Sequence, residues 1–214
     1  MWATYTLIRD DVCIVNIKSG RHLNAYHHGD LRAALLAGAR QAVEADGDRG
    51  LSLRALATAV GVSPNAPYRH FATKESLLAA VSAQGFAELT ARFASYEGAA
   101  GYDRLVGCFE AYLGYARENP GLYRLMFGRD LDPLSCEDAL GDAARACFTA
   151  LMAMVAHLLQ QNIADPQVPK AATLVWSLSH GAALLDIDRA TAFLAVDQRP
   201  TAPDLAKLIV GGLS

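Results

Sequence analysis

Apolar residues recur every three or four positions over most of the chain, which is the pattern of helices that bury one face. Glycine, proline and acidic residues separate these runs, as they do at helix ends. The sequence therefore predicts an all-α fold. The expected helices are Gly29 to Ala45, Ser52 to Val60, Ser63 to Phe71, Thr73 to Tyr96, Tyr102 to Glu118, Leu122 to Phe127, Cys136 to Gln161, Lys170 to Leu185 and Asp204 to Leu213.

The segment from Leu51 to Leu78 has the spacing of two short helices joined by a tight turn. Leu53, Leu56 and Val60 share one face of the first helix. Gly61 follows them at a position where such a turn needs a positive φ angle, which glycine adopts without steric cost.

The second short helix and its successor have start signals of their own. Ser63 is a suitable N-cap, and Pro64 suits the first helical position after it. Thr73 can cap a third, longer helix, with Glu75 in its first turn interacting favourably with the helix dipole. Two short helices, a glycine turn and a longer supporting helix are the spacing of a helix-turn-helix motif.

The same segment resembles the DNA-binding part of TetR-type (tetracycline-repressor-like) transcriptional regulators. Upstream, Tyr26–Arg32 is similar to the start of the first helix in one branch of that family, and Trp176 with His180-Gly181 is similar to a Trp/His-Gly motif in the ligand domain of the same branch. The runs that carry the resemblance are Gly61-Val62-Ser63, Tyr68-Arg69-His70-Phe71 and Lys74-Glu75-Ser76-Leu77-Leu78.

The resemblance implies a three-helix helix-turn-helix head over residues 26–75 and a larger helical ligand-binding and dimerisation domain over residues 76–214. It implies a homodimer that binds a double-stranded DNA operator and a small-molecule effector. The run Lys170–Leu185 is apolar almost all round, so we expect it to be covered on two sides. The resemblance implies that its own ligand domain covers one side and a partner subunit the other.

The two faces of the predicted recognition helix have different roles. Pro67 and Phe71, four residues apart, are expected in the core. Asn65 and Arg69 carry donors that read adenine and guanine edges, and Ala66 can meet a thymine methyl group.

The remaining contacts follow from the resemblance. Tyr68, His70 and Lys74 resemble the phosphate contacts of the family, and the amides at the Thr73 cap are expected beside them. The residues expected at the DNA are Arg54, Ser63, Asn65, Ala66, Tyr68, Arg69, His70, Thr73 and Lys74.

Aromatic and sulfur-containing residues are frequent in the second domain, where the resemblance implies an effector pocket. An apolar pocket with a few polar tips suits a small apolar or aromatic molecule. Trp176 and His180, one helical turn apart, are the foremost candidates. The residues expected to line the pocket are Phe109, Tyr112, Tyr115, Met126, Phe127, Phe148, Met152, Trp176 and His180, with Tyr123 beside them.

Charge and cysteine content add little to this prediction. The chain of 214 residues has a net charge of −3, with nine Lys/Arg against seven Asp/Glu in residues 1–82 and ten against fifteen afterwards. The four cysteines form no C-x-x-C pair, and no secretory signal is evident, so we expect reduced thiols in a cytoplasmic protein. The nucleophile, phosphate-loop and zinc motifs of common enzymes are missing, so no enzyme, cofactor or metal is expected.

Residues 1–25 allow two interpretations. The run Tyr5–Ile17 is strand-like in content, but an isolated hairpin would be marginally stable. The extension either lacks fixed structure or is an arm that brings Lys18 and Arg21 to the DNA.

The predicted function is a ligand-responsive transcriptional regulator. We expect a repressor that binds a palindromic operator as a dimer and is released from the DNA by an effector; activation instead of repression fits the sequence equally well. The alternative is a helical ligand-binding or interaction protein of the same fold with little specific DNA binding. Two features favour the alternative: the weakly positive head, and Pro67, which removes an early hydrogen bond from the recognition helix, so that we expect the helix to be tightened at its start.

Overall fold

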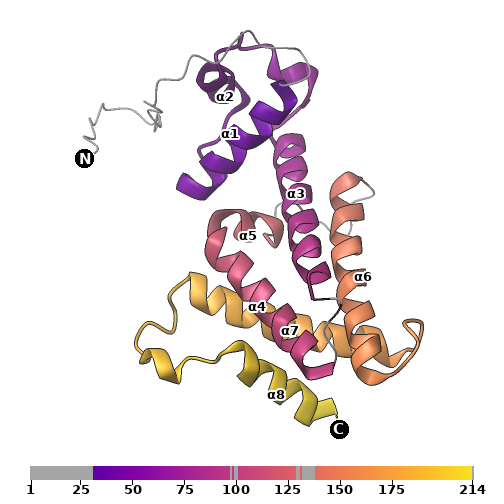
Figure 1. Ribbon diagram of the computed structural model, residues 1–214. Helices are drawn as coiled ribbons and strands as arrows, with labels where there is room; N and C mark the ends of the chain where they lie inside the picture. The colour runs from indigo at the N-terminus through magenta and orange to yellow at the C-terminus, as the bar shows by residue number, and fades with distance from the viewer. Residues whose placement is uncertain (1–30, 97, 99–100, 129–130, 132–137, 214) are drawn as a thin grey trace.

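The structure is a computed structural model that describes residues 31–96, 98, 101–128, 131 and 138–213 (Figure 1). All the regular elements assigned in these residues are helices, which confirms the all-α prediction. The extension 1–25 and the residues Tyr26–Asp30 lie outside the described residues. The elements are α1 (Leu31–Asp46), α2 (Leu53–Val60), the 3₁₀ helix η1 (Pro67–Arg69), α3 (Lys74–Ala94), α4 (Gly101–Glu118), α5 (Pro120–Met126), α6 (Ala139–Leu159), α7 (Gln167–Ile187), the 3₁₀ helix η2 (Val196–Gln198) and α8 (Ala202–Leu213).

Helices α1 and α2 form the head with the N-terminal part of α3. The Ser52 side chain caps α2 by accepting from the Ala55 amide at 3.1 Å. Gly61 ends α2 with φ at +79°, so the predicted left-handed turn is present. The head core contains buried Leu35, Leu56 and other apolar side chains, and Phe71 closes it beside the start of α3.

The segment Ser63–Phe71, called the recognition segment below, is shorter and tighter than the predicted helix. Turns lead from Pro64 into η1, and the Ala66 and Arg69 amides bond to carbonyls three residues earlier. Pro67 has no amide to bond to the Ser63 carbonyl, so a regular helical turn cannot form there. The predicted helix from Ser63 is therefore wrong in type, and the tightening expected from Pro67 is present.

Helix α3 belongs to both halves of the molecule. Thr73 and Ser76 form a reciprocal capping box at its start, as the Thr73 cap signal predicted. Its 21 residues span roughly 30 Å at 1.5 Å per residue. Figure 1 shows α3 leaving the head and continuing into the body beside α6. The expected domain boundary after residue 75 therefore falls within the first turn of one continuous helix.

The body is a bundle in which α3, α4, α6 and α7 surround a common interior, with α5 and α8 packed at its edges (Figure 1). By length and composition, α6 is the one described helix that could cross a membrane. Here it packs against α3 and α7, with Leu140, Val155 and Ala156 buried, so we interpret it as a core helix.

A second contact joins the head to the body where α1 meets α5. The Glu44 carboxylate accepts from the amides of Gly121 and Leu122, each at 2.9 Å, and so caps the N-terminus of α5. Beside it, the Arg40 guanidinium pairs with Glu88 of α3 and donates to Asn119 Oδ1 at 2.8 Å.

Gly121 makes the close approach of α1 and α5 possible. A Cβ atom at Gly121 would lie 2.8 Å from the Cα of Glu44 and closer still to the Val43 carbonyl oxygen. Those atoms are backbone, so the two helices would have to separate. We expect Gly121→Ala to lower the free energy of unfolding by about 1–3 kcal/mol through overpacking.

Gly114→Ala, within α4, is the matched control. A Cβ atom there meets nothing nearer than 3.9 Å, so the usual helical gain of about 0.5–1 kcal/mol is expected. Urea unfolding of both variants measures the difference. Equal stabilities would show that α1 and α5 are not held at this distance.

Candidate DNA-binding surface and ligand cavity

The recognition segment presents its polar side chains outward from a buried base. Pro67 and Phe71 are buried, as predicted, and anchor the segment to the head core. Asn65, Tyr68 and Arg69 are exposed, and Tyr68 is 46% exposed despite its large apolar ring. The fold therefore leaves the Asn65 amide, the Arg69 guanidinium and the Tyr68 phenol available to a ligand on the outer face of the head.

The remaining residues expected at the DNA lie around this face in different environments. Arg54, Ser63 and His70 are exposed, and Ala66 is half-buried. The Thr73 side chain is engaged in the capping box of α3. The Lys74 ammonium donates to the Arg49 carbonyl at 3.4 Å, which holds this cation at the edge of the head.

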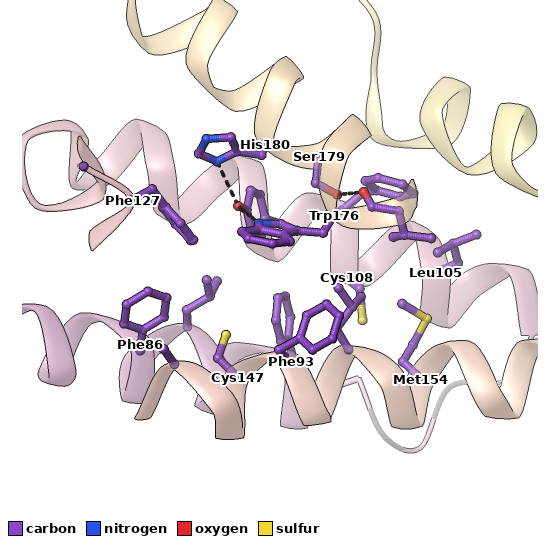
Figure 2. A pocket seen from close by; sticks show the side chains of 18 residues that line it. Phe86, Phe93, Leu105, Cys108, Phe127, Cys147, Met154, Trp176, Ser179 and His180 are labelled. Carbon is purple, nitrogen blue, oxygen red and sulfur yellow. Dashed lines mark hydrogen bonds between the residues drawn. The ribbon is translucent and has the colours of Figure 1, made fainter. Parts of the chain in front are cut away.

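The body contains a cavity of about 500 Å³ between α3, α4, α6 and α7, with the end of α5 at one side (Figure 2). Six of the nine residues expected to bind a ligand line it, namely Phe109, Tyr112, Phe127, Phe148, Trp176 and His180. They come from α4, α6, α7 and the residue that ends α5, so the fold brings together residues distant in sequence.

Tyr115, Met126 and Met152 are not among the lining residues. The Tyr115 hydroxyl donates to Glu88 at 3.2 Å, so the side chain belongs to the contact between head and body. Met126 is fully buried against Gly85 of α3. Met152 is half-buried on α6, next to Leu151, which does line the cavity, so its side chain leaves the helix in another direction.

The sequence interpretation missed one whole wall of the cavity. Helix α3 contributes Phe86, Leu89 and Phe93 at helical spacing, a pattern that a helix also shows when it only packs against another helix. The further lining residues are Phe86, Leu89, Phe93, Leu105, Cys108, Gly128, Ala144, Cys147, Leu151, Met154, Val175 and Ser179.

A cluster of four polar side chains forms part of the cavity wall and links α4, α5 and α7. The Trp176 indole donates to the Tyr112 hydroxyl at 3.2 Å. The Tyr123 hydroxyl lies 2.9 Å from that of Tyr112 and 2.7 Å from Nδ1 of His180. A longer contact of 3.4 Å joins Nδ1 of His180 to the Tyr112 hydroxyl. Figure 2 shows the His180 ring near Phe127, with Leu105 and Met154 at the opposite end of the cavity. Tyr123 is the one member of the cluster that does not line the cavity.

Among the described residues, none that lines the cavity carries a permanent charge. Burial raises the pKa of Tyr112 well above its ordinary value and the pKa of Cys147 to about 11. Burial also lowers the pKa of His180, because desolvation penalises the imidazolium. The described part of the wall therefore carries no charge at physiological pH.

Comparison with known proteins agrees with this arrangement in both halves. The model of bacterial regulatory proteins of the tetR family matches residues 35–81, and the model of the tetracyclin repressor-like C-terminal domain matches residues 105–206. The chain has the fold and both domains of the TetR family. The head is thus a TetR-type helix-turn-helix DNA-binding domain, and TetR-family proteins are transcriptional regulators rather than enzymes. The branch with a Trp/His-Gly motif stays a prediction.

Solved structures resemble the chain over most of its length. A protein of unknown function from Rhodococcus sp. RHA1 is 29% identical with a TM-score of 0.70, and the match covers 89% of this chain and 96% of that one. A regulatory protein of the tetR family from Rhodococcus RHA1 is 25% identical with a TM-score of 0.58, covering 85% and 94%. The TetR-family regulator PfmR of Thermus thermophilus shares the fold at 23% identity, with a TM-score of 0.57 and coverage of 84% and 98%. No curated protein matches the chain.

His180 gives this TetR-type body a stability that depends on pH. The folded pKa lies below the ordinary 6.5, so between the two values the unfolded chain binds a proton that the folded chain does not. We expect the free energy of unfolding to fall as the pH is lowered from 7.5 through 6.5, by less than about 1.4 kcal/mol per pH unit from this group.

Urea unfolding of the wild type and of His180→Gln at several pH values measures this contribution. The variant loses the bond to Tyr123, so its stability is lower at pH 7.5, but its dependence on pH is flatter. Parallel curves for the two proteins would show that His180 is not buried as a neutral ring.

Proposed function

We propose that this protein is a cytoplasmic, homodimeric repressor that binds a palindromic operator and is released from it by a small apolar or aromatic effector. The observation that carries the proposal is the position of α3. Its first turn supports the recognition segment, while Phe86, Leu89 and Phe93 of the same helix line the cavity. A molecule that fills the cavity contacts the helix on which the DNA-binding face rests.

The exposed residues of the recognition segment, together with Lys74 at the start of α3, suit a major groove. Asn65 and Arg69 supply donors for base edges, and Tyr68 and Lys74 supply contacts to phosphate, which orient the head without reading sequence. A two-fold dimer presents two such segments, so the operator has two half-sites about one helical turn apart, or a multiple of it.

Release by an effector requires different affinities for two arrangements of the dimer. The effector must favour the arrangement in which the two heads no longer match the operator. Two connections can transmit the change, namely α3 and the contact between Glu44 and the N-terminus of α5. Helix α5 is suited to this role because it carries Tyr123 of the polar cluster and leads directly into Phe127.

A double substitution in the head tests the DNA contact. We expect Tyr68→Phe with Lys74→Ala to weaken operator binding by about tenfold or more, because two phosphate contacts are lost, and to reduce the salt dependence of binding. Fluorescence anisotropy measures the affinity and its salt dependence with DNA from upstream of the protein's own coding sequence. If the wild type binds that DNA no better than scrambled DNA, an operator obtained by random-sequence selection takes its place.

The matched control makes the same two changes in the body, Tyr102→Phe with Lys170→Ala, and is expected to bind DNA as the wild type does. Circular dichroism and thermal unfolding check that both double variants fold. Unchanged operator affinity in the head variant would contradict the assigned contacts.

An apolar stripe on α7 supports the proposed dimer. Leu174 is 60% exposed and Leu185 is 50% exposed, with Gly181 between them on the same side of the helix. Leu208 of α8 is 64% exposed. These side chains form an apolar surface that a single protomer leaves in water, and small residues such as Gly181 let two helices approach closely.

Gly181→Arg tests this surface. A Cβ atom at Gly181 meets no described atom of the same protomer within 4 Å, so the substitution has room in the monomer and blocks only a neighbouring subunit. We expect light scattering after size exclusion to show a monomer with unchanged helical content and an operator affinity lowered by about a hundredfold or more, because one head then binds alone.

Ala146→Arg adds the same side chain to an exposed position of α6 and is expected to leave the dimer intact. A Gly181→Arg protein that remains dimeric would place the interface elsewhere.

One observation favours the second candidate, a ligand-binding or interaction protein of this fold with little specific DNA binding. The recognition segment has only a three-residue 3₁₀ helix, which leaves fewer side chains in regular register for a groove. Selection from random DNA separates the two functions. The regulator enriches one palindromic sequence with an affinity about a thousandfold above that for scrambled DNA, whereas the second candidate enriches none.

A further inference from the structure

We propose that the cavity takes an uncharged, largely aromatic molecule that carries one hydrogen-bond acceptor oxygen, and that the Tyr112 hydroxyl donates to that oxygen. This inference deepens the proposed function, because it names the chemical class of the effector. It rests on the lining of the cavity and on the number of protons available to the polar cluster.

The described lining carries no charge that could pair with an ion. A carboxylate or an ammonium buried against these apolar side chains needs a counter-charge, and no charged residue is among those described around the cavity. Arg104 lines a separate space of about 100 Å³. Phe93, Cys108, Leu151 and Met154 line both spaces.

The polar cluster has two ways to arrange its protons. With the His180 proton on Nε2, the three protons of Trp176, Tyr112 and Tyr123 occupy the three short contacts in sequence, and none is left over. Trp176 donates to Tyr112, Tyr112 donates to Tyr123, and Tyr123 donates to Nδ1 of His180. This arrangement satisfies the cluster without a ligand.

With the His180 proton on Nδ1, the cluster has one proton more than it has short contacts, and the longer contact of 3.4 Å between Nδ1 and the Tyr112 hydroxyl cannot accept the Tyr112 proton, because Nδ1 is then a donor. His180 then donates to Tyr123 at 2.7 Å, Tyr123 donates to Tyr112 at 2.9 Å, and the Trp176 indole donates to Tyr112 at 3.2 Å. The Tyr112 proton has no acceptor within the cluster. Since Tyr112 lines the cavity, an oxygen of the ligand can accept that proton.

The rest of the lining selects the body of the molecule. Phe86, Phe93, Phe109, Phe127 and Phe148 surround the space with ring faces and edges, which suit flat aromatic rings in offset or edge-on contact. A volume of about 500 Å³ accommodates fused rings rather than a single small ring.

Tryptophan fluorescence tests the proposal without DNA. The sequence has two tryptophans, so Trp2→Phe leaves Trp176, in the cavity wall, as the sole reporter. The probes share one tricyclic skeleton and differ in one group: 2-acetylphenanthrene, 2-ethylphenanthrene, phenanthrene-2-carboxylate and the 2-aminomethyl compound, which is a cation.

We expect the ketone to quench Trp176 saturably and to bind about fivefold to tenfold more tightly than the ethyl compound, since one neutral hydrogen bond is gained. Both ions are expected to bind at least about a hundredfold more weakly than the ketone. Tyr112→Phe should remove the advantage of the ketone over the ethyl compound. Tyr115→Phe, a buried tyrosine of the same helix outside the cavity, should keep that advantage.

Three results would overturn the proposal: no saturable quenching by the ketone, equal affinities for the ketone and the ethyl compound, or tighter binding of the carboxylate than of the ketone. In the last case, a loss of affinity in Arg104→Met would identify an anion site at Arg104 instead. The four probes measured on the Trp2→Phe protein test the proposed ligand class even if Tyr112→Phe does not fold. The quenching series contains no DNA, so its outcome is independent of operator binding. A protein that binds its operator in the anisotropy experiment but does not bind the ketone would overturn the proposed ligand class and leave the regulator function intact.

Discussion

The structure depends on one continuous helix that two domains share. Helix α3 supplies Leu77, Leu78 and Val81 to the core of the head, and Phe86, Leu89 and Phe93 to the cavity of the body. An α-helix with a capped start is stiff over this length, so its two halves cannot move independently. This constraint makes the contents of the cavity relevant to the orientation of the recognition segment, although the two sites share no residue.

The contact between α1 and α5 adds a second connection and explains the polar residues found there. Arg40, Glu88, Asn119 and Tyr115 form one hydrogen-bonded group between head and body, and Glu44 caps α5 beside them. Removing any one member leaves partly buried polar groups unsatisfied, which costs more than the lost bond itself. A head held at two places can adopt a small number of discrete orientations, which is what a switch between two states requires.

Local signals in the sequence predicted the head well. The Thr73 cap, the Gly61 turn and the buried Pro67 and Phe71 follow from the chemistry of single residues and their nearest neighbours. The 3₁₀ form of the recognition segment was predictable only in part, because the missing Pro67 amide indicates a tightened start and not how far the tightening extends.

The cavity was predicted less completely, for a physical reason. Periodicity shows which face of a helix is buried but not whether that face meets another helix or an open space, so the α3 wall was missed. Tyr112 and Tyr115 lie three residues apart on α4 and are both buried, yet one lines the cavity and the other bonds Glu88. Residue 88 lies far from residues 40 and 115 in sequence, so no local pattern could have placed the three together.

The central claim is that the cavity and the DNA-binding face are thermodynamically coupled through α3 and α5. The most direct test is to measure the affinity of one cavity ligand, by Trp176 quenching in the Trp2→Phe protein, for the free dimer and for the dimer saturated with operator. Linkage requires that operator weaken ligand binding by the same factor by which the ligand weakens operator binding, typically about 5-fold to 150-fold. Equal affinity of the ligand for the free and the operator-bound dimer would contradict the account, because the cavity would then have no influence on the DNA-binding face.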